Sequence, residues 1–394
     1  MTFGLTMTRH ISLLFCLMFG FTACATQDVF PDIGTNMASP TGLAVDSTAR
    51  RLYVTNANSE VSYDWQQGSF QVLDITSPAA PTLVNTVQTR SYSGKISLDP
   101  TAKRAYVTNR FSSDFDVSED RLFSMNIDES TTNFLSIDET VTTRDPFATA
   151  CCVVQNRLLL STAENALLSF DVTAAELTPK TISLRRELSN GVLPASSSMS
   201  DLVVIGDQAF ISRASGGIFV VNLNEIENSD VNPVDYFIAD VRTPRGLATD
   251  GTNLLVADED IVGDTFAQRM LILDISSLMP DTDNTQVTLK DKDDDGLLQA
   301  AINVGKNPQQ IVVAAGRAFV TNADDDMVSV IDLTSRTVVK TITVGDKPFG
   351  MAIDAPNNTP TTLYVGNLLG NNLSIIDISS SDPTTFSVVA RYPQ

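Results

Sequence analysis

Histidine is nearly absent from the 394-residue chain, where the only one is His10. The remainder of the chain therefore cannot form Ser-His-Asp or Cys-His catalytic sites, bind zinc or non-haem iron through histidine, or use histidine as a general base. The CxxCH pattern that attaches c-type haem is also missing. These absences argue against an enzyme, although carboxylates, lysines or a calcium ion could still support catalysis.

Tryptophan and positive charge are scarce as well. Trp65 is the only tryptophan, so the chain cannot supply the tryptophan-docked blades of quinoprotein dehydrogenases. Lysine and arginine number 26 against 47 aspartates and glutamates, which gives a formal net charge of −21. A field of this sign repels nucleic acid and anionic lipid head groups. We expect no haem, no nucleotide cofactor and no nucleic-acid partner.

Only four cysteines are present, and Cys16 and Cys24 lie in or next to an apolar N-terminal segment. The other two, Cys151 and Cys152, are adjacent in the sequence. Neighbouring residues of a strand point to opposite faces, so two small buried thiols are one interpretation. A strained vicinal disulfide in an oxidising compartment is the other.

The N-terminus has the features of an export signal. Arg9 and His10 precede an apolar run over residues 11–21, and a small-residue cleavage site ends in Cys24. This pattern resembles a bacterial lipoprotein signal, which implies that residues 1–23 are removed and that Cys24 is lipidated. An ordinary secretory signal or an uncleaved anchor is the alternative.

The residues after Cys24 favour an address in the bacterial cell envelope, at the outer membrane, because Ala25 and Thr26 occupy the places where an Asp would favour inner-membrane retention. Residues 24–39 are polar and carry Gly, Pro and Asn, which predicts a flexible tether between the lipid and the folded domain.

The clearest repeat unit spans residues 307–345. It contains four apolar or alternating runs of strand length, separated by short Gly, Asn and Asp clusters: residues 310–314, 317–321, 327–332 and 338–344. Four strands in so short a unit form one antiparallel blade, which must stack against others to bury its faces. Seven such units over residues 40–394 predict an all-β fold, a seven-bladed β-propeller of four-stranded antiparallel blades.

The strands of some units are harder to place. We expect the outer strand of the second unit near residues 134–137 and the second strand of the fifth unit over residues 253–258. A long insertion precedes the last strand of the fifth unit, at residues 298–305.

A tetrapeptide recurs in register in the second strand of four units: Tyr53-Val54-Thr55-Asn56, Tyr106-Val107-Thr108-Asn109, Phe319-Val320-Thr321-Asn322 and Tyr364-Val365-Gly366-Asn367. The repeat therefore resembles the YVTN-type repeat of bacterial seven-bladed β-propellers, the lactonase-like and surface-layer group. The resemblance implies the fold strongly and the function weakly, because such propellers carry many unrelated activities.

The insertion in the fifth unit contains a candidate calcium loop. Asp291, Asp293 and Asp295 provide oxygen ligands at alternate positions, a glycine follows for the sharp turn, and Leu297 could add its carbonyl. The closing glutamate of such loops is replaced by Ile302, so a carboxylate from elsewhere would be needed. We expect a structural calcium ion here, with a solvated acidic loop as the alternative.

The connections between second and third strands should all emerge on one face of a propeller. In this chain they carry the acidic residues Asp258, Glu259, Asp260, Asp324, Asp325 and Asp326. The turns between first and second strands, on the opposite face, carry Arg50, Arg51, Lys103, Arg104, Arg157 and Arg317. This pattern predicts an acidic face suited to cations or a basic partner, unless the acidity serves only solubility.

These observations favour a lipid-anchored, non-catalytic envelope propeller, a monomer that binds a protein or a cationic surface ligand. The alternative is a metal-dependent hydrolase of the lactonase-like group, with water held by carboxylates near the centre of the ring. The candidate carboxylates Asp46, Asp99, Asp250 and Asp354 recur at one position of the repeat. Recurrence indicates blade geometry rather than a single catalytic site.

Overall fold

The computed structural model describes residues 36–58, 68–89, 93–109, 121–142, 149–162, 166–184, 187–188, 191–192, 199–228, 232–239, 241–262, 265–276, 278, 285–287 and 297–393. The chain divides into two units, residues 1–32 and 33–394, and every described residue belongs to the second. No helix among the described residues has the length and apolar character needed to cross a membrane.

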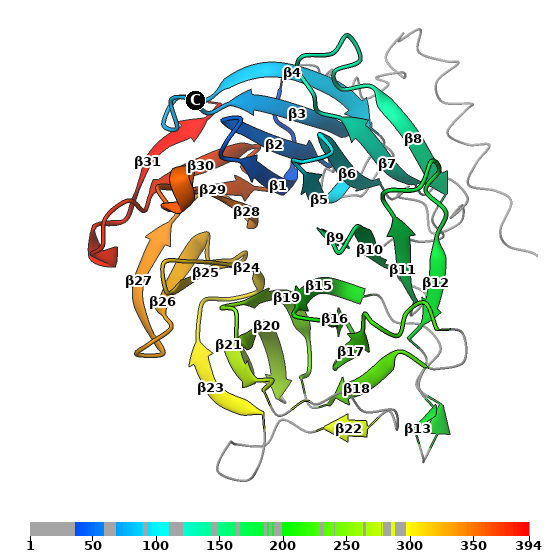
Figure 1. Ribbon diagram of the computed structural model, residues 1–394. Helices are drawn as coiled ribbons and strands as arrows, with labels where there is room; N and C mark the ends of the chain where they lie inside the picture. Colours follow the sequence, from blue (N-terminus) through cyan, green and yellow to red (C-terminus); the bar gives the residue numbers. More distant parts are fainter. Residues whose placement is uncertain are drawn as a thin grey trace, which may run out of the picture. The chain divides into compact units, whose positions relative to one another are not determined.

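Seven antiparallel sheets follow one another around a centre within this unit (Figure 1). Blades 1 to 3 contain β1 (Pro40–Asp46), β2 (Arg51–Asn56), β3 (Gly68–Asp74) and β4 (Thr82–Thr89); β5 (Ser93–Asp99), β6 (Arg104–Asn109), β7 (Arg121–Asn126) and β8 (Ile137–Thr142); and β9 (Thr149–Val154), β10 (Arg157–Ser161), β11 (Ala166–Asp171) and β12 (Lys180–Ser183). Blades 4 and 5 contain β15 (Met199–Ile205), β16 (Gln208–Arg213), β17 (Ile218–Asn222) and β18 (Val234–Ile238); and β19 (Pro244–Thr249), β20 (Asn253–Val262), β21 (Thr265–Asp274) and β23 (Leu298–Asn303).

Blades 6 and 7 complete the series with β24 (Pro308–Ala314), β25 (Arg317–Asn322), β26 (Met327–Asp332) and β27 (Thr337–Thr343); and β28 (Pro348–Asp354), β29 (Thr362–Asn367), β30 (Asn372–Asp377) and β31 (Ser387–Tyr392). The short 3-10 helices η3 (Pro356–Asn358) and η4 (Pro383–Thr385) lie in the connections of blade 7, and β13 (Glu187–Leu188) and β14 (Gly191–Val192) form a small hairpin after blade 3.

The innermost strands form a closed series of neighbours. Each first strand contacts the first strand of the next blade, from β1 through β5, β9, β15, β19, β24 and β28, and β28 contacts β1 again. The sequence prediction of a seven-bladed β-propeller is therefore confirmed.

Apolar packing holds the blades together. Among the described residues there are seven clusters of buried apolar side chains, and each cluster lies between two neighbouring blades. Middle strands are consequently covered on both sides: β29 is buried at every residue, whereas the outer strand β31 alternates between exposed and half-buried residues. Since a buried leucine or valine contributes roughly 1.5–3 kcal/mol, these clusters supply most of the force for stacking.

The threonine of the repeated tetrapeptide joins its blade to the next one. Thr55 Oγ1 donates to Gly94 O at 2.9 Å, and Thr321 Oγ1 donates to Phe349 O at 3.1 Å. Both carbonyls lie in β-bulges at the start of β5 and β28. Because a bulge leaves a residue out of the ladder, its carbonyl is free to accept from a neighbouring blade.

The asparagine of the tetrapeptide acts inside its own blade. Asn322 Nδ2 donates to Ser329 Oγ at 2.9 Å, and Asn367 Nδ2 donates to Ser374 Oγ at 3.0 Å. Each pair links the end of the second strand to the third strand. The repeated tetrapeptide therefore stabilises the propeller, through its threonine between blades and its asparagine within a blade.

Three strands depart from the sequence prediction. The outer strand of blade 2 is β8 at Ile137–Thr142, not residues 134–137, because Leu135 has a φ of 62° and the chain turns there. β20 continues to Val262, well beyond residue 258, and forms a long hairpin with β21. The unpredicted strand β22 (Thr285–Val287) pairs in parallel with β18 as a fifth strand of blade 4.

Candidate functional site

The predicted calcium ligands Asp291, Asp293 and Asp295 lie outside the described residues. Leu297 is described: its side chain is buried between blades 4 and 5, and its carbonyl accepts a hydrogen bond from Asp274 N at 2.8 Å. That carbonyl already has one structural partner. Among the described residues no group of three or more histidine, cysteine, aspartate or glutamate side chains is arranged to hold a metal ion.

The acidic run in the β25–β26 turn is paired with lysines from the connections between blades. Asp324 Oδ1 lies 2.5 Å from Lys347 Nζ, and this hydrogen bond is the main reason that the pKa of Asp324 is lowered. Asp325 accepts from Lys306 N at 2.8 Å, and Asp326 accepts from Lys347 N at 2.9 Å. These lysines lie in the blade-to-blade connections, which emerge on the same face as the loops between second and third strands and were not part of the sequence prediction.

The other predicted acidic residues lie in strand β20 rather than in a loop. Asp258 is completely buried and forms an ion pair with Arg269 at 2.9 Å, while Thr243 N donates to its other oxygen at 3.0 Å. Glu259 lies 3.6 Å from Arg245 Nη2. Asp260 belongs to the same strand. Asp258 thus contributes to blade packing and is not available on the surface.

Three of the predicted basic residues of the opposite face form ion pairs. Arg51 contacts Asp74 at 2.8 Å, Arg104 forms an ion pair with Asp138, and Arg157 contacts Glu227 at 2.6 Å. In the described part of the chain, both faces therefore carry charges of both signs.

The carboxylates considered for a hydrolase mostly cap turns. Asp46 Oδ1 accepts from Thr48 N and Ala49 N, and Asp99 and Asp250 cap the equivalent turns of blades 2 and 5 in the same way. Each repeated aspartate thereby satisfies backbone donors of its own turn. Their recurrence at one repeat position thus reflects a shared turn in each blade.

One polar contact near the centre of the ring had no sequence signal. Lys95 of β5 forms an ion pair with Asp201 of β15, although blade 3 lies between their blades. The second oxygen of Asp201 accepts from Leu247 N of blade 5 at 2.9 Å. Asp201 is almost fully buried, so this contact ties three blades together.

The contact between blades 7 and 1 closes the ring and lacks the threonine hydroxyl. Gly366 occupies that position, and a Cβ added there would lie 3.0 Å from both Leu43 Cδ1 and Pro40 O. In the described sheets, no strand passes from one of these blades to the other. Closure therefore depends on side-chain packing and polar contacts.

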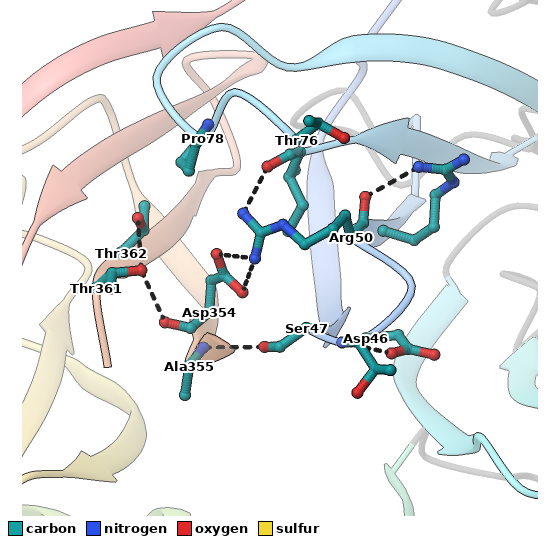
Figure 2. A network of polar contacts seen from close by, with 12 residues as sticks. Asp46, Ser47, Arg50, Thr76, Pro78, Asp354, Ala355, Thr361 and Thr362 are labelled. Carbon is teal, nitrogen blue, oxygen red and sulfur yellow. Dashed lines mark hydrogen bonds and ion pairs between the residues drawn. The ribbon is translucent and has the colours of Figure 1, made fainter. Parts of the chain in front are cut away.

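An ion pair crosses this contact near the other end of β29 (Figure 2). Arg50 Nη1 lies 2.7 Å from both carboxylate oxygens of Asp354, and Arg50 Nη2 donates to Ile75 O at 2.7 Å. Asp354 is completely buried, and beside it Ala355 N donates to Ser47 Oγ at 2.9 Å (Figure 2). A buried carboxylate requires such a partner, because removing an unpaired charge from water is costly.

The contact between blades 1 and 2 places different side chains at the same repeat positions. Lys103 stands where Arg50 stands, since each follows the first strand with a positive φ, 55° and 60°. Each also accepts a backbone hydrogen bond from an isoleucine: Ile127 N donates to Lys103 O as Ile75 N does to Arg50 O. By the same alignment, Asp46 replaces Asp354 and Tyr53 replaces Tyr364.

Here a cleft of about 160 Å³ remains open. Asp46, Tyr53, Lys103, Asp128 and Glu129 contribute to its lining. The first two are largely buried, at 7% and 2% exposure, and Lys103 is exposed. Burial raises the pKa of the Tyr53 phenol, and the carboxylates of Asp46 and Glu129 raise it further. Sequence reasoning missed this cleft, because its lining comes from three separate segments that only the fold brings together.

Two further sequence predictions concern cysteines. Cys24 lies outside the described residues. Cys151 and Cys152 are consecutive residues of β9, the inner strand of blade 3, and the structure describes only their backbone.

Comparison with known proteins supports the fold. The LVIVD repeat model matches residues 65–89 and 363–393, which include β3 and β4 of blade 1 and most of β29 to β31 of blade 7. No curated protein matches the sequence. The YVTN likeness thus rests on the four tetrapeptides, while the matched repeats flank the contact that closes the ring.

Solved structures resemble the chain over nearly its whole length. Hydrazine synthase of Kuenenia stuttgartiensis matches with a TM-score of 0.64 and 11% identity, covering 89% of this chain and 98% of that one. The β-propeller domain of Cps50 (Swd1) from Myceliophteria thermophila matches with a TM-score of 0.60 and 10% identity, covering 86% and 96%. At such identities the likeness concerns the fold alone.

Proposed function

We propose that this chain is a non-catalytic binding protein of the bacterial cell envelope, anchored to the outer membrane through lipid on Cys24. Its propeller binds a protein or a cationic surface ligand. The observation that best supports this function is the use of its carboxylates. Asp46 and Asp99 cap turns, and Asp258 and Asp354 hold arginines between or within blades, which are structural tasks. The cleft between blades 1 and 2 supplies an acidic recess for a partner.

Lipid attachment can be tested by metabolic labelling with a radioactive fatty acid in a bacterial host. The wild-type chain should incorporate label and sediment with outer membranes. The Cys24→Ala variant should lose both properties, whereas Cys16→Ala should not change the identity of the labelled residue. Label that persists in Cys24→Ala would contradict the proposed anchor.

Partner binding can be tested with a photo-crosslinking amino acid introduced at exposed positions of intact cells. Ser130 next to the cleft and Leu369 on the opposite face probe the two faces, and Val389 on the outer strand of blade 7 serves as the control. We expect a discrete heavier adduct from at least one face position and none from Val389. No adduct from any position, in cells that contain folded and lipidated protein, would contradict a binding function.

Calcium binding at residues 291–297 is a separate proposal, supported by the spacing of the three aspartates. Thermal unfolding with calcium and with excess chelator tests it. A lower Tm on chelation, absent from Asp293→Ala, is expected, and identical Tm values in both buffers would contradict it.

A further inference from the structure

We propose that the cleft between blades 1 and 2 binds the guanidinium group of an arginine side chain from a partner protein. The inference rests on the proposed binding function and specifies the chemistry of the partner. It rests on a comparison of two blade contacts, because the equivalent place between blades 7 and 1 is occupied by the guanidinium of Arg50.

The filled site shows what such a place offers. The guanidinium of Arg50 is bound by the carboxylate of Asp354 and by the carbonyl of Ile75. Close by, Tyr364 Oη donates to Pro78 O at 3.4 Å. A planar guanidinium with several donors fits a carboxylate and a carbonyl together, which a single ammonium does less well.

The open site has the same acceptors and no occupant from the described chain. Asp46 replaces Asp354, and only its Oδ1 accepts hydrogen bonds from described residues. Ile127 replaces Ile75 and lines the cleft. The ammonium of Lys103 forms no hydrogen bond or ion pair with a described residue, although its charge lowers the pKa of Asp128, whose main cause of lowering is the hydrogen bond from Ser130.

Tyr53 is a second, independent sign of a missing ligand. Its side chain is 2% exposed and lines the cleft, yet no described residue forms a hydrogen bond with its hydroxyl. The equivalent Tyr364 has Pro78 O as a partner. The Tyr53 hydroxyl therefore lines the cleft without a partner from the described chain, and it can form a hydrogen bond with a group bound there.

Size and charge decide the class of occupant. Pockets that bind drug-sized ligands measure roughly 300–1,000 Å³, so a cleft of about 160 Å³ suits the end group of one side chain. Asp46, Asp128 and Glu129 surround it, and Glu129 is already shared with Arg51. A cation is therefore favoured, and an arginine within a peptide chain avoids bringing its own α-carboxylate close to these acids.

The test measures binding of N-acetyl-arginine amide to the full-length chain by NMR titration, with the lysine and citrulline amides and free arginine as comparisons. The arginine amide should bind most tightly. Equal binding of the lysine or citrulline amide would overturn the guanidinium assignment. Tighter binding of free arginine would overturn the assignment to a partner protein.

Conservative variants locate the binding. Asp46→Asn keeps the Oδ1 acceptor of the turn and should weaken binding about tenfold or more, as expected for loss of a charged partner. The matched control Asp99→Asn alters the same turn of blade 2 and should bind as the wild type does. Tyr53→Phe should weaken binding about threefold. Unchanged binding by Asp46→Asn would overturn the proposal.

Lys103→Arg provides a test that does not depend on loss of stability. It should fill the cleft from within, as Arg50 fills the contact between blades 7 and 1, and so abolish binding while raising Tm. Wild-type binding by Lys103→Arg would overturn the proposal.

If the arginine amide fails to bind while adducts at Leu369 persist, the cleft assignment is wrong and the binding function stands. If the amide binds but no adducts form, the binding function is wrong instead.

Discussion

The contacts between blades 7 and 1 and between blades 1 and 2 use the same repeat positions in opposite ways. Between blades 1 and 2, Thr55 donates across the contact and the recess beneath it stays open. Between blades 7 and 1, Gly366 takes the threonine position and Arg50 fills the recess. One contact thus depends on a hydroxyl and leaves a site available, whereas the other depends on a buried ion pair.

The difference follows from the position of each contact in the chain. Blades 1 and 2 are consecutive, so their connection keeps them near each other even when the contact loosens. Blades 7 and 1 come from opposite ends of the propeller, and only their contact prevents the ring from opening. A stronger and more specific polar contact at the closing position is what this topology requires.

Removal of Arg50 should have the largest effect on the stability of the fold. In Arg50→Ala the carboxylate of Asp354 remains completely buried without its cation, which should cost about 3–5 kcal/mol of unfolding free energy. Urea unfolding measures the loss. Arg51→Ala is the matched control, because its partners Asp74 and Glu129 are partly exposed and each pair should contribute about 1 kcal/mol or less. Equal losses in the two variants would show that the closing ion pair has no special importance.

Removal of a threonine hydroxyl should have an intermediate effect. Thr321→Val keeps the shape of the side chain but leaves Phe349 O of blade 7 without its donor, which should cost about 1–3 kcal/mol. The exposed Thr343→Val tests the effect of the same substitution on a strand surface and should stay within about 0.5 kcal/mol. A Thr321→Val chain as stable as Thr343→Val would contradict the role given to the tetrapeptide.

Acid pH should produce the smallest effect and should not distinguish the two contacts. The pKa values of Asp128, at the open contact, and Asp377, in blade 7, are both lowered, mainly by a side-chain hydrogen bond from the serine two residues later. A lowered carboxyl pKa stabilises the fold above its unfolded value near 3.8, and this contribution disappears as the pH falls through the folded pKa. Ser379→Ala should therefore destabilise the chain more at pH 6 than at pH 3. A difference independent of pH would contradict this assignment.

The fold could be predicted because each blade repeats the same local information. Four short runs per unit and a shared tetrapeptide define strand number and order, and burial on both faces explains why the middle residues of the second strands are mostly apolar. Where a unit departs from the pattern, sequence was insufficient. The turn at Leu135 and the pairing of β22 with β18 depend on a positive φ and on a partner strand far away in the sequence.

The polar sites were less predictable, because charge pairing depends on which connections share a face. The acids at 324–326 were identified, but the lysines beside them belong to connections that a count of one loop class omits. The open cleft has Lys103 in place of the arginine at position 50, and Asp128 and Glu129 in place of Thr76 and Ser77. Only a comparison of equivalent repeat positions in the structure shows that the carboxylate of Asp46 has no arginine beside it.

A pair of double-mutant cycles tests the central comparison most directly. The coupling free energy between positions 50 and 354 and that between positions 103 and 46 would be obtained by urea unfolding of the alanine single and double variants. We predict a coupling of about 1–3 kcal/mol at the closing contact and a value near zero at the open one. Equal couplings at the two contacts would contradict the distinction between a filled closing site and an open cleft.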